Sequence, residues 1–107
     1  MKLYKLVKGK KYLDEILKER GIEGLNEVLK EYEELGATRK MVEGMWILTG
    51  DTIVVKSIKE LLEKGFEKSI CRNIEVVVHD RLFLESRPCY RKGDEAYITE
   101  SVYEGLW

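Results

Sequence analysis

The chain is poor in several residue types that carry recognisable chemistry. Its 107 residues include no glutamine, two asparagines, one proline, one histidine and two cysteines. Its longest unbroken apolar run, Met45–Leu48, is far shorter than the roughly 20 residues of a membrane-spanning helix. Neither a Gly-rich dinucleotide fingerprint nor a G-x-S-x-G nucleophile elbow is present. These absences exclude the sequence signatures of a helical membrane protein, a dinucleotide-binding enzyme and a serine hydrolase.

Charge, by contrast, is abundant and balanced. Charged residues make up 36% of the chain, against a usual fraction of about 25%, and the net charge is -1. Lysine and glutamate dominate while amides are scarce, a composition typical of thermophile proteins, which favour ion-pair networks over heat-labile side chains. Hydrophobic residues are 44% of the chain, enough for one modest core, so we expect a single domain over residues 1–107.

The cysteines and the N-terminus bear on the cellular compartment. A secreted domain of this size usually carries more disulfides, and the lysine-rich N-terminus lacks the apolar stretch of a signal peptide. We therefore expect a cytoplasmic protein with reduced thiols and no membrane attachment. A Cys71–Cys89 bridge stays open as an alternative, because thermophile cytosols sometimes contain disulfides.

Apolar residues at helical spacing predict a helical hairpin near the N-terminus. After a strand over residues 1–7, two apolar stripes at i, i+3 and i+4 spacing end at Gly21 and Gly36. Glycine at these places takes the left-handed conformation that closes a helix. A third, shorter helix is predicted between Ser57 and Gly65, with Ser57 as its cap.

The remaining segments alternate or are rich in β-branched residues, and they predict strands. These segments cover residues 45–49, 52–56, 74–78, 82–87 and 96–103. Turns are predicted at Gly50-Asp51, His79-Asp80 and Lys92–Asp94, and Pro88 is expected at a strand end or edge. We therefore predict an α+β fold, with a mostly antiparallel sheet of about five to six strands and three helices on one face.

The segment 25–49 resembles the end of a winged-helix domain. A helix closing in Glu34-Leu35-Gly36 is followed by Arg39–Val42, a turn at Glu43-Gly44 and the apolar stretch Met45–Thr49. The resemblance implies that the helix enters the major groove of DNA and that the two later segments form the wing. The helix itself is strongly acidic, a charge that disfavours contact with phosphates.

Two basic stretches, residues 1–12 and 72–92, offer another surface for nucleic acid. Lysine and arginine contacts to phosphate supply most non-specific affinity for nucleic acids. The candidate contacts, including two residues of the winged-helix-like segment, are Lys5, Lys8, Lys10, Lys11, Arg39, Lys40, Arg87, Arg91 and Lys92. A nucleic-acid-binding domain is therefore the first alternative for the function.

A third class of function depends on three residues that could carry thiol or metal chemistry. His79 could activate the thiol of Cys71 or Cys89, since a cysteine nucleophile needs a base or a positive field. The spacing of these three residues lacks the close ligand pair of a zinc site. A thiol- or metal-dependent enzyme is thus the second alternative, and a buried Cys71 with His79 in a turn is the favoured interpretation.

Aromatic residues near the C-terminus indicate a surface for another protein. The candidate interface residues are Tyr97, Tyr103, Leu106 and Trp107. Tryptophan anchors many interfaces, and the predicted strand Ala96–Tyr103 is expected at a sheet edge that needs covering. We therefore expect a small non-enzymatic protein-interaction or regulatory module that associates with itself or with another protein and needs no cofactor.

Overall fold

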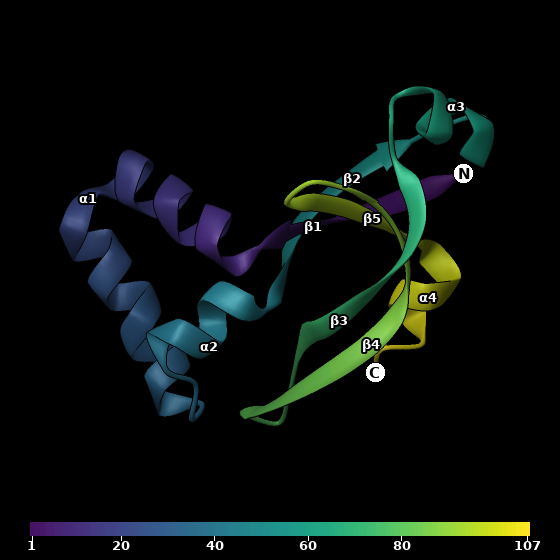
Figure 1. Ribbon diagram of the computed structural model, residues 1–107. Coiled ribbons are helices and arrows are strands. Elements are labelled where there is room, and N and C mark those ends of the chain that lie inside the picture. The colour runs from purple at the N-terminus through teal and green to yellow at the C-terminus, as the bar shows by residue number, and fades with distance from the viewer.

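Five strands and four helices make up the computed structural model, which describes all 107 residues (Figure 1). In chain order they are β1 (Lys2–Lys8), α1 (Gly9–Glu34), α2 (Arg39–Gly44), β2 (Trp46–Val54), α3 (Ile58–Glu63), β3 (Glu67–Val78), β4 (Arg81–Lys92), β5 (Glu95–Thr99) and α4 (Glu100–Glu104). The predicted α+β class is confirmed. The strands close into a barrel in the order β1-β2-β3-β4-β5, rather than forming an open sheet with helices on one face.

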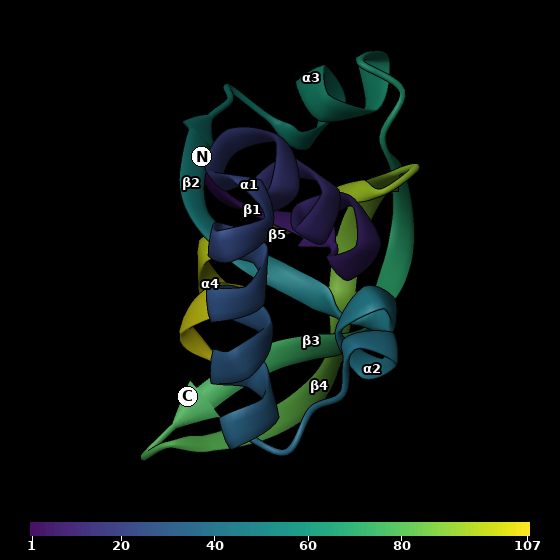
Figure 2. The ribbon, with the colours of Figure 1, turned by 90° about the vertical axis from the view of Figure 1, so that its left-hand side faces the viewer.

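All neighbouring strands are antiparallel except β2 and β3. These two meet in parallel at one residue pair, Trp46 and Ile74. The barrel is therefore weakly joined at this seam, and the two strands diverge beyond it. Helices α1 and α2 lie on one side of the barrel, while α4 lies beside the opposite wall (Figures 1 and 2).

The predicted pair of N-terminal helices is present as the two arms of α1, which are visible in Figure 1. The arms meet at Gly21, whose φ of 70° and ψ of -173° break the helical backbone. Gly36, with φ of 86°, follows the end of the second arm as predicted. The apolar faces of both arms pack on the outside of the barrel, against a cluster that includes Met45 and Ile47.

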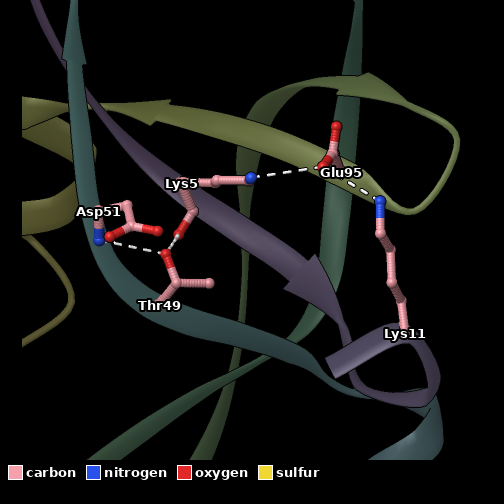
Figure 3. Close-up of polar contacts among 5 residues, drawn as sticks. All are labelled: Lys5, Lys11, Thr49, Asp51 and Glu95. Atoms are coloured by element: carbon pink, nitrogen blue, oxygen red, sulfur yellow. Dashed lines mark hydrogen bonds and ion pairs between the residues drawn. The ribbon is translucent and has the colours of Figure 1, made fainter. Parts of the chain in front are cut away.

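The predicted hairpin at Gly50-Asp51 is wrong, because β2 continues through it as one strand. In the pairing with β1, Tyr4 lies opposite Thr52 and Leu6 lies opposite Leu48, so β2 bulges between these pairs. The Thr49 hydroxyl donates to the Lys5 carbonyl at 3.4 Å, and the Asp51 N–H donates to the Thr49 hydroxyl at 3.1 Å (Figure 3). These hydrogen bonds stabilise the bulge. A Gly-Asp pair is compatible with both a bulge and a tight turn, so the sequence alone could not tell them apart.

One segment that the winged-helix resemblance implied as part of a wing, and the end of the predicted strand 96–103, are short helices instead. Arg39–Gly44 is α2, and its preceding Thr38 hydroxyl accepts the Met41 N–H at 3.3 Å. Residues 100–103 belong to α4, where the Thr99 hydroxyl accepts the Val102 N–H at 3.3 Å. In both cases a threonine N-cap outweighs the strand pattern. The wing implied by the winged-helix resemblance is therefore not formed.

Candidate functional site

The aromatic residues at the C-terminus fold back onto the barrel. The Tyr103 ring stacks on Tyr4 with centroids 3.8 Å apart, and Trp107 meets Tyr103 edge-on at 4.9 Å. Leu106 is buried, whereas the Trp107 side chain is 57% exposed. Tyr97 packs elsewhere, edge-on against Phe66 at 5.3 Å. The structure thus brings three of the four predicted interface residues together and separates Tyr97 from them.

The expectation of a sheet edge at residues 96–103 is wrong, because β5 pairs with β1 on one side and β4 on the other. One free edge lies on β4 instead. This strand pairs with β3 from Arg81 to Arg91, but with β5 only from Tyr90 to Lys92. Its distal part runs along the lower border of the molecule in Figures 1 and 2. Pro88 lies in this one-sided stretch, in agreement with the prediction.

The orientation of the β4 backbone follows from the hairpin that begins it. His79 and Asp80 form the predicted turn with φ of 51° and 60°, and Val78 and Arg81 pair across it. Along an antiparallel pair, hydrogen-bonded and non-hydrogen-bonded residue pairs alternate, and the pair Val78–Arg81 that flanks the turn is hydrogen-bonded. Starting with Leu82, every second residue of β4 therefore points its backbone N–H and C=O away from β3. These outward residues are Leu82, Leu84, Ser86 and Pro88, and the Ser86 carbonyl accepts the Arg87 guanidinium at 2.8 Å.

Two lysines of the predicted nucleic-acid surface are paired with Glu95 on β5. Its Oε1 lies 3.3 Å from Lys5 Nζ and 3.1 Å from Lys11 Nζ (Figure 3). The hydrogen bond from Lys11, with the Lys5 ammonium, holds the pKa of Glu95 below its usual range. Figure 3 shows both lysine side chains converging on this carboxylate from different elements.

Replacing Glu95 by glutamine should therefore change how stability depends on pH. A lowered carboxyl pKa contributes stability above the ordinary value of 4.5, and this contribution is lost as the pH falls through the folded-state pKa. We expect Glu95→Gln to be less stable than the wild type at pH 7, with the difference shrinking in acid. Urea unfolding from pH 3 to 8 measures this, with the exposed Glu67→Gln as control; parallel pH profiles for wild type and Glu95→Gln would contradict it.

Two further basic side chains cover the buried Trp46 of β2. Lys8 Nζ lies 4.9 Å and Arg91 Cζ 5.1 Å from its ring centroid. Burial, together with the nearby Arg91, lowers the pKa of Lys8 below its ordinary value. These cations are used to cover the barrel core, since long cationic side chains pack their stems and heads on aromatic faces.

The other candidate basic residues are split between internal contacts and scattered exposed positions. Arg87 pairs with Glu85 at 3.0 Å, and Lys92 Nζ donates to the Lys64 carbonyl at 2.9 Å. The exposed remainder is Lys10 on α1 with Arg39 and Lys40 on α2. The predicted basic face from residues 1–12 and 72–92 is therefore largely occupied by intramolecular contacts.

The predicted reactive cluster is not assembled. Cys71 and Cys89 form a disulfide with Cα atoms 5.9 Å apart, so the expectation of reduced thiols is corrected. Both cysteines are buried in the barrel core. His79 lies at the far tip of the β3–β4 hairpin and cannot serve as their base. No group of histidine, cysteine and carboxylate side chains is placed to hold a metal ion.

A cleft centred on Glu75 was missed by the sequence reasoning. It begins at the seam where β2 and β3 diverge, and two cavities meet at Glu75 and Val77. The first, of about 260 Å³, is also lined by Tyr4, Lys5, Leu48, Gly50, Tyr103 and Trp107. The second, of about 190 Å³, lies against α1 and is also lined by Tyr12, Val28, Glu31, Tyr32 and Leu35. The available signal was a single carboxylate inside the apolar run of residues 74–78.

Glu75 has a hydrogen-bond donor but no basic partner. The Tyr32 hydroxyl donates to its Oε2, and the backbone of Leu48 lies close to the same carboxylate. Burial raises the pKa of Glu75, and the hydrogen bond from Tyr32 and the nearby Leu48 backbone oppose this rise without cancelling it. Burial also raises the pKa of Tyr32, and the neighbouring Glu75 adds to the effect. The hydrogen bond from Tyr32 therefore orients the Glu75 carboxylate, while no lysine or arginine forms an ion pair with it.

None of the helices is both long enough and apolar enough to cross a lipid bilayer. Compared with protein-family models, with curated proteins and with solved structures, the chain matches none of them.

Proposed function

We propose that the protein is a non-enzymatic contact module that pairs with a second copy of itself through β4. The observation that supports this is the one-sided stretch Arg81–Cys89, whose outer edge carries no strand. Unpaired strand edges are templates for pairing with another chain. Two large apolar side chains on this stretch, Phe83 and Leu84, are 47% and 42% exposed.

The alternation of the backbone limits how two copies of β4 can pair. A residue whose backbone N–H and C=O point away from β3 can bond only to a residue of the other copy whose backbone groups also point away from its own β3. Leu82, Leu84 and Ser86 of one copy must therefore lie opposite members of the same set in the other. A two-fold centred on Phe83 satisfies this rule and places Leu82 opposite Leu84. It also places Arg81 opposite Glu85 on both sides of the axis, where opposite charges on facing residues stabilise pairing.

A neighbouring register is less favourable. A two-fold centred on Leu84 would place Arg81 opposite Arg87 twice and Phe83 opposite Glu85. Like charges directly opposite one another destabilise a strand pair. We therefore propose the register centred on Phe83, in which the two phenyl rings also meet across the axis.

A charge exchange tests this interface by sedimentation equilibrium. The wild type should show a mass of twice 12.5 kDa at high concentration. Arg81→Glu places one glutamate opposite each Glu85 of the other copy, which makes two like-charged pairs per dimer. It should weaken dimerisation by roughly tenfold, since each facing like-charged pair is unfavourable by up to about 1 kcal/mol. The double variant Arg81→Glu/Glu85→Arg restores opposite charges and should recover the dimer.

The exposed Arg72→Glu variant, on the neighbouring strand, changes net charge by the same amount and should leave the mass unchanged. A wild type that stays monomeric up to millimolar concentration would overturn the proposal. So would an Arg81→Glu dimer as tight as the wild type, or a double variant that fails to recover association while remaining folded by circular dichroism.

A further inference from the structure

We propose that the cleft at Glu75 binds a small organic cation, with the ammonium group in the cavity between α1 and β3. This inference is independent of the pairing through β4. It depends on three features of the cleft, which are an uncompensated carboxylate, aromatic walls and the absence of any basic residue lining the cavity against α1.

The carboxylate is the first feature. Glu75 is half-buried and takes part in no ion pair, although the chain holds 19 lysines and arginines. The one basic side chain that lines the adjoining cavity is Lys5, and its Nζ is turned to Glu95 at 3.3 Å (Figure 3). Because a buried carboxylate is stable when paired, a cationic ligand would supply the partner that the protein does not.

The aromatic walls are the second feature. Tyr12 and Tyr32 line the cavity against α1, beside Glu75. Ring faces attract ammonium groups, most strongly where water is partly excluded. A contact of this kind exists nearby, since Lys2 Nζ lies 5.2 Å from the centroid of the Tyr4 ring, a residue that lines the adjoining cavity.

The shape of the cleft limits the ligand. The cavity against α1 is about 190 Å³, and Val28, Leu35 and Val77 contribute apolar surface to it. This volume suits a quaternary or primary ammonium with a short alkyl group rather than a large ligand. The Glu31 carboxylate also lines this cavity, so the charge of its walls favours a cation and disfavours an anion.

The test compares two probes that have the same shape but different charge, choline and 3,3-dimethylbutan-1-ol. We expect choline to shift the backbone amide signals of Tyr32, Glu75 and Val77 saturably in proton–nitrogen NMR spectra, and the neutral alcohol to bind at least tenfold more weakly. Equal shifts from both probes would show apolar binding only and overturn the proposal, as would no shift from choline at these residues.

Variants separate the role of the carboxylate from the integrity of the fold. Glu75→Gln keeps an oxygen that can accept from Tyr32 but removes the charge, and it should weaken choline binding at least tenfold. Tyr12→Leu removes one ring without touching the hydrogen bond to Glu75 and should weaken it severalfold. Glu67→Gln, an exposed carboxylate on the same strand, is the matched control and should bind like the wild type. Unchanged affinity in both Glu75→Gln and Tyr12→Leu would overturn the site.

Discussion

Replacing both Cys71 and Cys89 by alanine is expected to lower the free energy of unfolding by at least about 3 kcal/mol. The disulfide closes a loop between residues 18 positions apart, and a cross-link over a loop of this length restricts the unfolded chain by about that amount. Both side chains are buried in the barrel core, 0% and 2% exposed, so their truncation also removes packing. Guanidinium unfolding followed by circular dichroism measures the change.

Reduction of the wild type provides the matching control. Unfolding in the presence of a strong thiol reductant should move the wild-type midpoint toward that of the double variant, because both then lack the cross-link. The double variant itself should not respond to the reductant. If the reductant left the wild-type midpoint unchanged, or if the double variant unfolded at the same midpoint as the wild type, the bridge would not be a stabilising element.

There is a physical reason why the sequence alone could not decide whether Cys71 and Cys89 form a disulfide. Counting outward from the predicted turn at His79-Asp80, an uninterrupted hairpin would place Cys71 opposite Pro88, with Cys89 on the other face of the sheet. The observed register shifts between Cys71 and Ile74, where Asn73 has a φ of 61°. This bulge turns both cysteines toward the barrel core. A bulge depends on the pairing of two strands, and no local pattern around Asn73 predicts it.

The same distinction between local and non-local causes runs through the whole fold. The backbone breaks at Gly21 and Gly36 were predictable, because a glycine after an apolar stripe acts locally. The continuous β2 was not, because the bulge at Gly50 is stabilised by the facing strand β1. Closure of the barrel likewise depends on pairs between the two ends of the chain, such as Leu3 with Thr99.

The candidate sites follow this pattern. The aromatic tail was recognised from composition, yet its placement against Tyr4 depends on how β1 and α4 meet. The predicted edge strand β5 is internal, because closure of the barrel pairs it with β1 as well as β4. The short pairing between β4 and β5 leaves residues 81–89 of β4 without a second neighbour. Glu75 differs from both, since a lone carboxylate in an apolar strand is visible in the sequence and its partners Tyr32 and Leu48 are not.

Gly9→Ala is expected to destabilise the protein by about 3 kcal/mol, because there is no space for a side chain where β1 passes into α1. A Cβ at this position would lie 1.6 Å from the Val42 carbonyl oxygen and 2.6 Å from its carbon. Overpacking usually costs about 1–3 kcal/mol, and a backbone carbonyl cannot relieve the clash by changing rotamer. The Gly9 N–H also donates to the Met45 carbonyl at 2.8 Å, so any shift that makes room strains this bond.

Gly44→Ala is the matched control for this prediction, since Gly44 ends α2 and an added Cβ there meets nothing within 4 Å. Replacing a glycine in open space by alanine restricts the unfolded chain and should change stability by less than about 1 kcal/mol, in the stabilising direction. Urea unfolding of both variants at 25 °C gives the comparison. Equal stabilities would mean that α1 and α2 do not approach as closely in solution. A large loss in Gly9→Ala alone would show that the close approach of Gly9 to the Val42 carbonyl is present in solution.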